Sequence, residues 1–122
     1  MGIIIASNNL FRLELSAYLL SEAGHTVHEI DSGDALLHAL EHHSPCLIVL
    51  DSQLDRETPR SLLGLLLQRA SAPVLVLGGL HPTDLQALRA QGGDAISWPY
   101  QNDDLVARAQ ALKLAARAIA SA

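Results

Sequence analysis

Asp51 is the residue best placed to do chemistry, because it is a carboxylate at the end of a short, unbroken apolar run. Residues 46–50 read Cys-Leu-Ile-Val-Leu and follow Ser44-Pro45, a pattern that predicts a strand buried on both faces. In an open parallel sheet, ligands bind beyond the carboxyl ends of the strands. The sequence therefore predicts that Asp51 lies at the edge of a sheet where a bound group would sit.

The elements around Asp51 are predicted by an alternation of apolar runs and amphipathic stretches. Strands are expected at residues 3–6, 25–30, 46–51, 74–77 and 95–97, each followed by a helix, the last helix beginning near residue 102. This alternation predicts one α/β, flavodoxin-like domain over residues 1–122, with helices on both faces of a parallel five-stranded sheet. The second and fifth strands are polar or short and belong at the edges, so right-handed crossovers give the order 2-1-3-4-5.

The segments next to the predicted strand ends define the surroundings of Asp51. Ser7 and Asn8 follow the first strand, so they are expected at the same edge of the sheet as Asp51. Residues 52–57 are polar and predict a loop. Thr58 and Pro59 then predict the start of the third helix, because threonine is a good N-cap and proline is favoured at the first helical position.

The composition limits the classes of function. The chain has 122 residues, a net charge of −5 and scattered Lys and Arg residues, which argue against direct binding of nucleic acid. No apolar run reaches transmembrane length, and the N-terminus lacks the pattern of a signal peptide. The one cysteine, Cys46, fits a reducing compartment. We therefore expect a cytoplasmic protein without membrane contact.

The pattern from residue 3 to about residue 117 resembles the receiver domain of bacterial two-component response regulators. Three features carry the resemblance: the apolar strand that ends in Asp51, Pro73 at the start of the fourth strand, and Pro99-Tyr100 after the fifth strand. The resemblance implies that Asp51 stands at the phosphoacceptor position. It also implies a cis peptide bond before Pro99, which the preceding aromatic residue favours.

Five positions depart from the pattern of this family. Where members have two acidic residues after the first strand, this chain has Ser7 and Asn8. Family members have Ser or Thr at the end of the fourth strand, where this chain has Gly78. They have an aromatic residue in the fifth strand, where this chain has Ala95. Where they have a lysine before the proline, it has Trp98. Of the residues that do chemistry in the family, only Asp51 remains.

These departures predict a weak magnesium site. Mg²⁺ prefers carboxylate ligands and offsets the repulsion between a phosphoryl group and the carboxylate that attacks it. Ser7 and Asn8 offer neutral oxygen atoms, and Trp98 cannot form the ion pair that a lysine would form. We therefore expect no cofactor, with Mg²⁺ binding weak or absent, and no catalytic or metal-ligating residue.

Several side chains have alternative interpretations. Asp55 and Glu57 could replace the missing carboxylates or lie in a solvated loop, and Trp98 could cover Asp51 or lie on the surface beside the last helix. His38 and His42 are four residues apart on the second helix, a spacing that suits a metal ion. No third ligand is evident in the sequence, so exposed histidines without a metal are expected.

The sequence predicts an atypical receiver domain in two-component-type signal transduction. It would be no enzyme and would act without phosphorylation, through contact with a protein partner or an output domain, such as a DNA-binding domain outside this chain. A homodimer is expected through the helix after the fourth strand, the fifth strand and the last helix. One alternative is a conventional phosphoacceptor that uses Asp51 with a weakened Mg²⁺ site. Another is a small-molecule-binding regulatory domain, with a pocket between the residues at the ends of the strands: Ser7, Asn8, Asp51, Gly78 and Trp98.

Overall fold

The computed structural model describes residues 2–57 and 61–121. Its strands are β1 (Ile3–Ala6), β2 (Val27–Ile30), β3 (Leu47–Asp51), β4 (Val74–Leu77) and β5 (Asp94–Ile96). Its helices are α1 (Leu10–Glu22), α2 (Gly33–His42), α3 (Ser52–Glu57), α4 (Leu62–Arg69), α5 (Pro82–Ala90) and α6 (Asn102–Ser121). In this part of the chain, no helix combines the length and the apolar composition needed to span a membrane.

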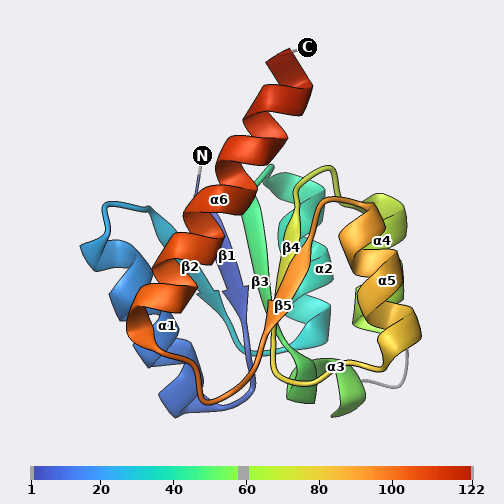
Figure 1. Cartoon of the computed structure of the whole chain (residues 1–122). Helices are drawn as coiled ribbons and strands as arrows, with labels where there is room; N and C mark the ends of the chain where they lie inside the picture. The colour runs from blue at the N-terminus through green and yellow to red at the C-terminus, as the bar shows by residue number, and fades with distance from the viewer. Residues whose placement is uncertain (1, 58–60, 122) are drawn as a thin grey trace.

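The strands form one parallel sheet in the order β2-β1-β3-β4-β5, which confirms the predicted topology (Figure 1). Burial explains this order, because every residue of β1, β3 and β4 is buried. The edge strand β2 instead exposes His28 and Glu29. An edge strand has a neighbouring strand on one side only, so polar residues that reach solvent are tolerated there.

Helices cover both faces of the sheet, as predicted (Figure 1). On one face, alternate strand residues such as Ile5 and Val49 pack with α1 and α6. On the other face, their neighbours such as Ile48 and Leu50 pack with α2, α3, α4 and α5. Each fully buried Leu or Ile contributes roughly 1.5–3 kcal/mol. The two apolar clusters therefore hold the carboxyl ends of the strands, and the side chains at those ends, in fixed positions.

The prediction of a loop at residues 52–57 is wrong, because these residues form helix α3. Asp51 starts this helix: its Oδ1 accepts a hydrogen bond of 2.9 Å from the backbone N–H of Gln53. Leu54 is buried in the core cluster beneath α3. A carboxylate at the helix start and one buried leucine thus stabilise a helix too short to show an amphipathic period.

The start of the next helix also differs from the prediction. Thr58 and Pro59, the expected N-cap and first residue, lie outside the described residues. Helix α4 begins at Leu62, and its N-cap is Ser61, whose Oγ accepts a hydrogen bond of 3.1 Å from the N–H of Gly64. Asp55 accepts a hydrogen bond of 3.0 Å from the N–H of Leu63, so α3 itself helps to start α4.

Three strands differ from their predicted bounds by one or two residues. The second strand begins at Val27 rather than at residue 25, and the third begins at Leu47 rather than at residue 46. The fifth covers Asp94–Ile96 rather than residues 95–97. His25 follows α1 and helps to cap its C-terminal end, because its N–H donates to the carbonyl of Leu20 over 3.1 Å. The chain can leave the helix there because Gly24 adopts a left-handed φ of 98°.

Candidate functional site

Asp51 lies at the carboxyl end of β3, at the edge of the sheet where the sequence places it. Its side chain has no exposed surface. A buried carboxylate must be paired or hydrogen-bonded, because its desolvation is unfavourable. The partners of Asp51 therefore determine what this site can do.

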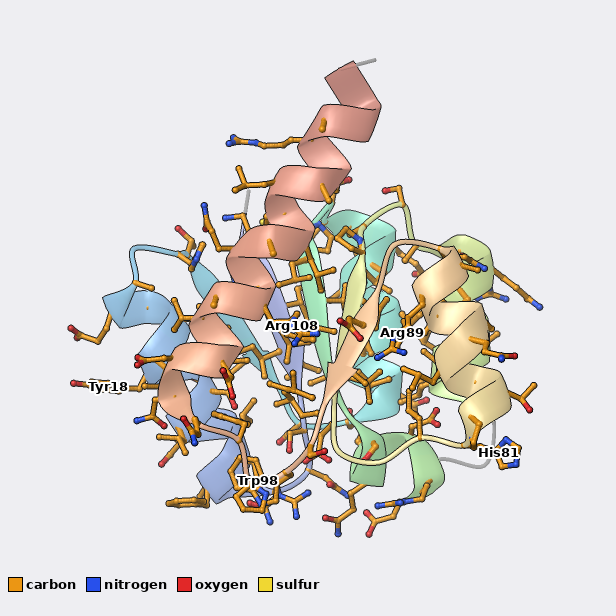
Figure 2. All side chains as sticks on the ribbon, in the orientation of Figure 1. Tyr18, His81, Arg89, Trp98 and Arg108 are labelled. Carbon is orange, nitrogen blue, oxygen red and sulfur yellow. The ribbon has the colours of Figure 1, made fainter. Side chains whose placement is uncertain are left out.

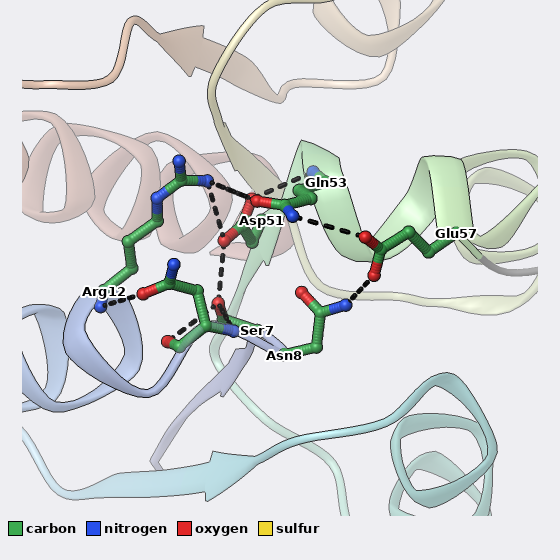
Figure 3. Close-up of polar contacts among 7 residues, drawn as sticks. Ser7, Asn8, Arg12, Asp51, Gln53 and Glu57 are labelled. Carbon is green, nitrogen blue, oxygen red and sulfur yellow. Dashed lines mark hydrogen bonds and ion pairs between the residues drawn. The ribbon is translucent and has the colours of Figure 1, made fainter.

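Three residues saturate the two oxygen atoms of Asp51 (Figure 3). The Oγ of buried Ser7 donates to Oδ2 over 2.7 Å, and the N–H of Gln53 donates to Oδ1 over 2.9 Å. Nη1 of Arg12 lies 3.2 Å from Oδ1 and 3.3 Å from Oδ2. Each oxygen thus receives two donors, and the charge of the carboxylate is balanced by a guanidinium.

Arg12 was not predicted from the sequence as a site residue. It lies in the first turn of α1, which Asn9 caps through a hydrogen bond of 3.0 Å from the N–H of Arg12 to Asn9 Oδ1. The guanidinium also donates to Oε1 of Gln53 over 3.2 Å. Its side chain is 22% exposed, so the ion pair with Asp51 is screened less than a surface pair would be.

Trp98 lies over Arg12 rather than directly over Asp51. The guanidinium carbon of Arg12 is 5.0 Å from the centroid of the Trp98 ring, a distance typical of a cation–π contact. Trp98 also meets the edge of the exposed ring of Phe11, with centroids 6.3 Å apart. Arg12 therefore lies between the carboxylate and the indole, in the space where the sequence suggested a small-molecule pocket.

The segment after β5 fixes the position of Trp98. The peptide bond between Trp98 and Pro99 is cis. Tyr100 packs against Trp98 with centroids 5.0 Å apart, and its hydroxyl lies 2.7 Å from Oγ of buried Ser16 on α1. Burial raises the pKa of Tyr100, and the hydrogen bond with Ser16 opposes this effect in part. This segment is therefore tied to α1, the helix that carries Arg12.

Asn8 does not contact Asp51. It is exposed and donates a hydrogen bond from Nδ2 to Oε2 of Glu57 (Figure 3). The other oxygen of Glu57 accepts a hydrogen bond of 3.2 Å from Nε2 of Gln53. Asp55 and Glu57 were the two possible replacement carboxylates. The carboxylate of Asp55 instead accepts a hydrogen bond at the start of α4, and the carboxylate of Glu57 accepts one from Asn8. Both lie on helix α3 and not in a loop.

Gly78 and Ala95 are the two positions predicted to lack the family's switch residues. Gly78 directly follows β4, and Ala95 lies on β5. Gly78 follows β4 with a left-handed φ of 115°, and its N–H donates to the carbonyl of Ile96 over 2.8 Å. A Cβ at Gly78 would clash with Oγ of buried Ser52. Ala95 packs against the core cluster on the α4 and α5 face of the sheet. Neither residue hydrogen-bonds to Asp51 through a side chain.

The residues around Asp51 do not fit a magnesium site. Mg²⁺ requires oxygen ligands in an octahedral arrangement and favours carboxylates. Here Asp51 already accepts from Arg12, Ser7 and Gln53, and the guanidinium would face the metal with like charge. Among the described residues, no buried side-chain nitrogen or oxygen lacks a hydrogen-bond partner. The network is therefore complete without a cation.

Several solved receiver domains have the same architecture. The receiver domain of NtrX from Brucella abortus has a TM-score of 0.78 and 24% identity, over 92% of this chain and 98% of that chain. A CheY-like response regulator receiver domain protein from Methanospirillum hungatei JF-1 has a TM-score of 0.79 and 18% identity, over 94% of each chain. Full-length FixJ from B. japonicum has a TM-score of 0.78 and 24% identity, over 98% of this chain and 61% of that chain.

The similarity is one of three-dimensional structure. Protein family models and curated protein sequences contain no match to this chain. The chain spans 28% of the longer NtrX structure that it also resembles, and 61% of full-length FixJ. The strand order and these structural neighbours agree with each other. The chain therefore has the fold of a response regulator receiver domain.

Proposed function

We propose that this chain is an atypical receiver domain that takes part in signal transduction through protein contacts, without a phosphorylation switch. One observation carries this proposal: the carboxylate at the phosphoacceptor position is buried and paired with Arg12. Both of its oxygen atoms already accept hydrogen bonds. An internal cation thus occupies the place where a metal ion and an incoming phosphoryl group would have to meet the carboxylate.

Phosphoryl transfer to Asp51 would require several unfavourable steps. Arg12 would have to leave both Asp51 and Trp98, and the hydroxyl of Ser7 would lose its acceptor. A dication would then have to bind without the two carboxylates that normally hold it. We therefore propose that Mg²⁺ binding is weak and that the chain catalyses no reaction of its own.

We propose that the domain acts on an output domain or on a separate protein partner. The lengths of full-length FixJ and of the longer NtrX structure support this, because this chain spans only part of each. The net charge of −5 disfavours contact between this chain and DNA. If the output is DNA binding, we propose that a separate domain performs it.

We also propose a homodimer through α5, β5 and α6. Asp94 on β5 forms ion pairs with Arg89 of α5 and Arg108 of α6, so this face holds a fixed arrangement of charges. The side chains of the two arginines point toward each other in Figure 2. A contact between the same face on two copies of the chain would form a two-fold dimer. Analytical ultracentrifugation over a range of concentrations should show a dimer. A monomer at every concentration would rule the dimer out.

Intact mass spectrometry after incubation with acetyl phosphate and Mg²⁺ tests the main proposal. The wild-type chain and the D51N variant, which lacks the acceptor, should both remain unmodified. Trp98 fluorescence should not respond to Mg²⁺, because no metal displaces the Arg12 guanidinium beneath the ring. A phosphoryl adduct on the wild type but not on D51N would overturn the proposal.

A conventional phosphoacceptor is the second candidate, and the position of Glu57 favours it. This carboxylate contacts Asn8 and helps to line a hollow of about 310 Å³ together with Asp31 and Asp34. A cation bound there would lie at the same edge of the sheet as Asp51. Under this alternative the wild type gains a Mg²⁺-dependent adduct, and E57Q reduces it. R56Q, on the same helix but without an ion pair in the described part of the chain, should leave the adduct unchanged.

A further inference from the structure

Three potential metal ligands lie together on the exposed face of α2, outside the Asp51 site. They are His38, Glu41 and His42, and their ligand atoms all lie within 4.8 Å of one another. The two imidazole rings contact each other, with centroids 4.6 Å apart. The sequence pointed to the two histidines without a third ligand, and the structure adds the carboxylate of Glu41.

We propose that His38, Glu41 and His42 form a binding site for a divalent transition-metal ion such as Zn²⁺. Imidazole nitrogen is a preferred ligand for Zn²⁺, Cu²⁺ and Ni²⁺, whereas Mg²⁺ and Ca²⁺ favour sites made of oxygen atoms. Two imidazoles and one carboxylate match a known zinc ligand set, in which water completes the coordination. The ligand atoms therefore favour Zn²⁺, Cu²⁺ or Ni²⁺ over Mg²⁺ and Ca²⁺.

The helix supplies the spacing. Residues three and four apart lie on the same face of an α-helix, so His38, Glu41 and His42 project side by side. Zinc–ligand bonds of about 2.0–2.1 Å in a tetrahedron put ligand atoms about 3.3 Å apart. The ligand atoms of the three side chains lie within 4.8 Å of one another. The distances between these atoms must therefore shorten by at most roughly 1.5 Å when the metal binds. All three are exposed, so rotation about their own bonds can achieve this.

The backbone beneath the site is well held. Oγ of Ser32 caps the start of α2 by accepting from the N–H of Ala35 over 3.1 Å. At the other end, the N–H of His43 donates to the carbonyl of Ala39 over 2.9 Å. Leu36 is fully buried beneath the helix. A site on one rigid element loses little conformational entropy when the metal binds.

The local electrostatics favour a cation. The site lies in the last turns of α2, where the helix dipole places partial negative charge. Among the described residues, Glu41 forms no ion pair or hydrogen bond through its carboxylate, so no existing contact must break. The neighbouring His43 stacks instead against His28, with centroids 6.1 Å apart.

The α2 site is separate from the proposed signalling site. Helix α2 starts at the edge of the sheet where Asp51 lies and runs back along the strands (Figure 1). Its last turns therefore lie toward the opposite edge, where the strands begin. Metal binding at α2 and phosphorylation at Asp51 can thus succeed or fail independently.

Isothermal titration calorimetry with ZnCl₂ tests the site, with tag-free protein that has been treated with a chelator. We expect saturable binding of one Zn²⁺ per chain and a rise in the thermal midpoint that a chelator reverses. H38Q and H42Q should each weaken binding by at least about tenfold, since even outer-shell changes produce losses of that size. E41Q should weaken binding less. Circular dichroism should show that each variant keeps its helix content.

The histidines outside the site provide matched controls. H28Q and H43Q remove imidazoles from the same side of the domain but none of the three ligands, so their zinc affinity should equal that of the wild type. Wild-type affinity in the H38Q/H42Q double variant would overturn the proposal. The absence of saturable zinc binding would overturn it too, as would a stoichiometry of one Zn²⁺ per two chains.

Discussion

At the level of single residues, the central feature is a buried ion pair in which the cation comes from α1. Asp51 is fully buried, and Arg12 contacts both of its oxygen atoms. Trp98 covers the other side of the guanidinium. Arg12, Ser7 and Gln53 together supply the counter-charge and the hydrogen bonds that this buried carboxylate needs.

Replacing Arg12 should therefore destabilise the fold. R12M leaves the carboxylate of Asp51 buried without its counter-charge, and loss of one member of a buried pair costs about 3 kcal/mol. Urea denaturation should show this loss of unfolding free energy. R56M, a change of the same type at an exposed arginine of α3, should change the unfolding free energy by less than about 0.5 kcal/mol.

A double variant separates charge from shape at this position. In R12M/D51N the buried group is neutral, so most of the destabilisation caused by R12M should disappear. If the double variant is as unstable as R12M alone, packing of the arginine stem is responsible and the ion-pair interpretation is wrong.

Gly78 is a second residue whose identity is dictated by its surroundings. G78A should lower the free energy of unfolding by about 2 kcal/mol, because a φ of 115° is strained for alanine and the new Cβ meets Oγ of Ser52. The matched control is G79A, since a Cβ there has no heavy atom within 4 Å. Equal effects of the two variants in chemical denaturation would contradict this explanation.

At the level of elements, Asp94 connects β5 to the helices on both sides of it. It accepts hydrogen bonds of 2.8 Å from the N–H of Ala95 and 3.1 Å from Nε of Arg89, and it also pairs with Arg108. Burial alone would raise the pKa of Asp94, but the hydrogen bonds from Ala95, Arg89 and Arg108 outweigh it, and the pKa is lowered.

Removal of this charge should loosen the attachment of α5 and α6 to β5. D94N should cost roughly 1 kcal/mol at neutral pH, because both arginines are substantially exposed and solvent screens the pairs. The pKa of Asp94 is lower in the folded chain than in the unfolded chain, where it is about 3.9. The charged side chain therefore stabilises the fold above about pH 3.9, and this stabilisation is lost as the pH falls through the folded pKa. The difference between wild type and D94N in urea denaturation should therefore shrink in acid. A constant difference would contradict the assignment.

At the level of the whole molecule, His25 makes stability depend on pH near neutrality. Its Nδ1 lies 2.8 Å from Nζ of Lys113 on α6, so the contact joins the end of α1 to the last helix. Burial lowers the pKa of His25, and repulsion from Lys113 lowers it further. In the unfolded chain His25 has a pKa of about 6.5 and takes up a proton there, whereas in the folded chain it does so only at lower pH. The free energy of unfolding therefore decreases as the pH falls below about 6.5.

Chemical denaturation at about pH 7.5 and about pH 5.5 checks this effect. The wild type should lose more unfolding free energy on acidification than H25Q, which cannot take up the proton. K113M should also reduce the loss, because it removes the repulsion. H28Q, at an exposed position on the edge strand β2, serves as the control. An identical loss in wild type and H25Q would rule out His25 as the source.

Much of the architecture follows directly from local sequence patterns. The strands β1 and β4 have the predicted bounds, because wholly apolar runs leave few alternatives. Helix α6 begins at Asn102, near which it was predicted to begin. The polar character of β2 placed it at the edge of the sheet. The strand order followed from this distribution of polarity and from the handedness of crossovers.

Helix α3 could not be found in this way. Its six residues are too few to show a helical period, and most of them are polar. The helix exists because Asp51 accepts a hydrogen bond at its start and Leu54 enters the core. Both contacts require the strand β3 to be in place, so this element depends on tertiary structure.

The position of Asp51 at the carboxyl end of a buried strand follows from local sequence, because an unbroken apolar run ends at this carboxylate. The partners of Asp51 depend on the folded chain. Arg12 is 39 positions from Asp51 in the chain, and nothing local links the two residues. One sign was available: a cation in the first turn of a helix opposes the helix dipole, so a nearby carboxylate would stabilise it. Identifying that partner requires the sheet, because parallel pairing of β1 with β3 brings the start of α1 to the end of β3.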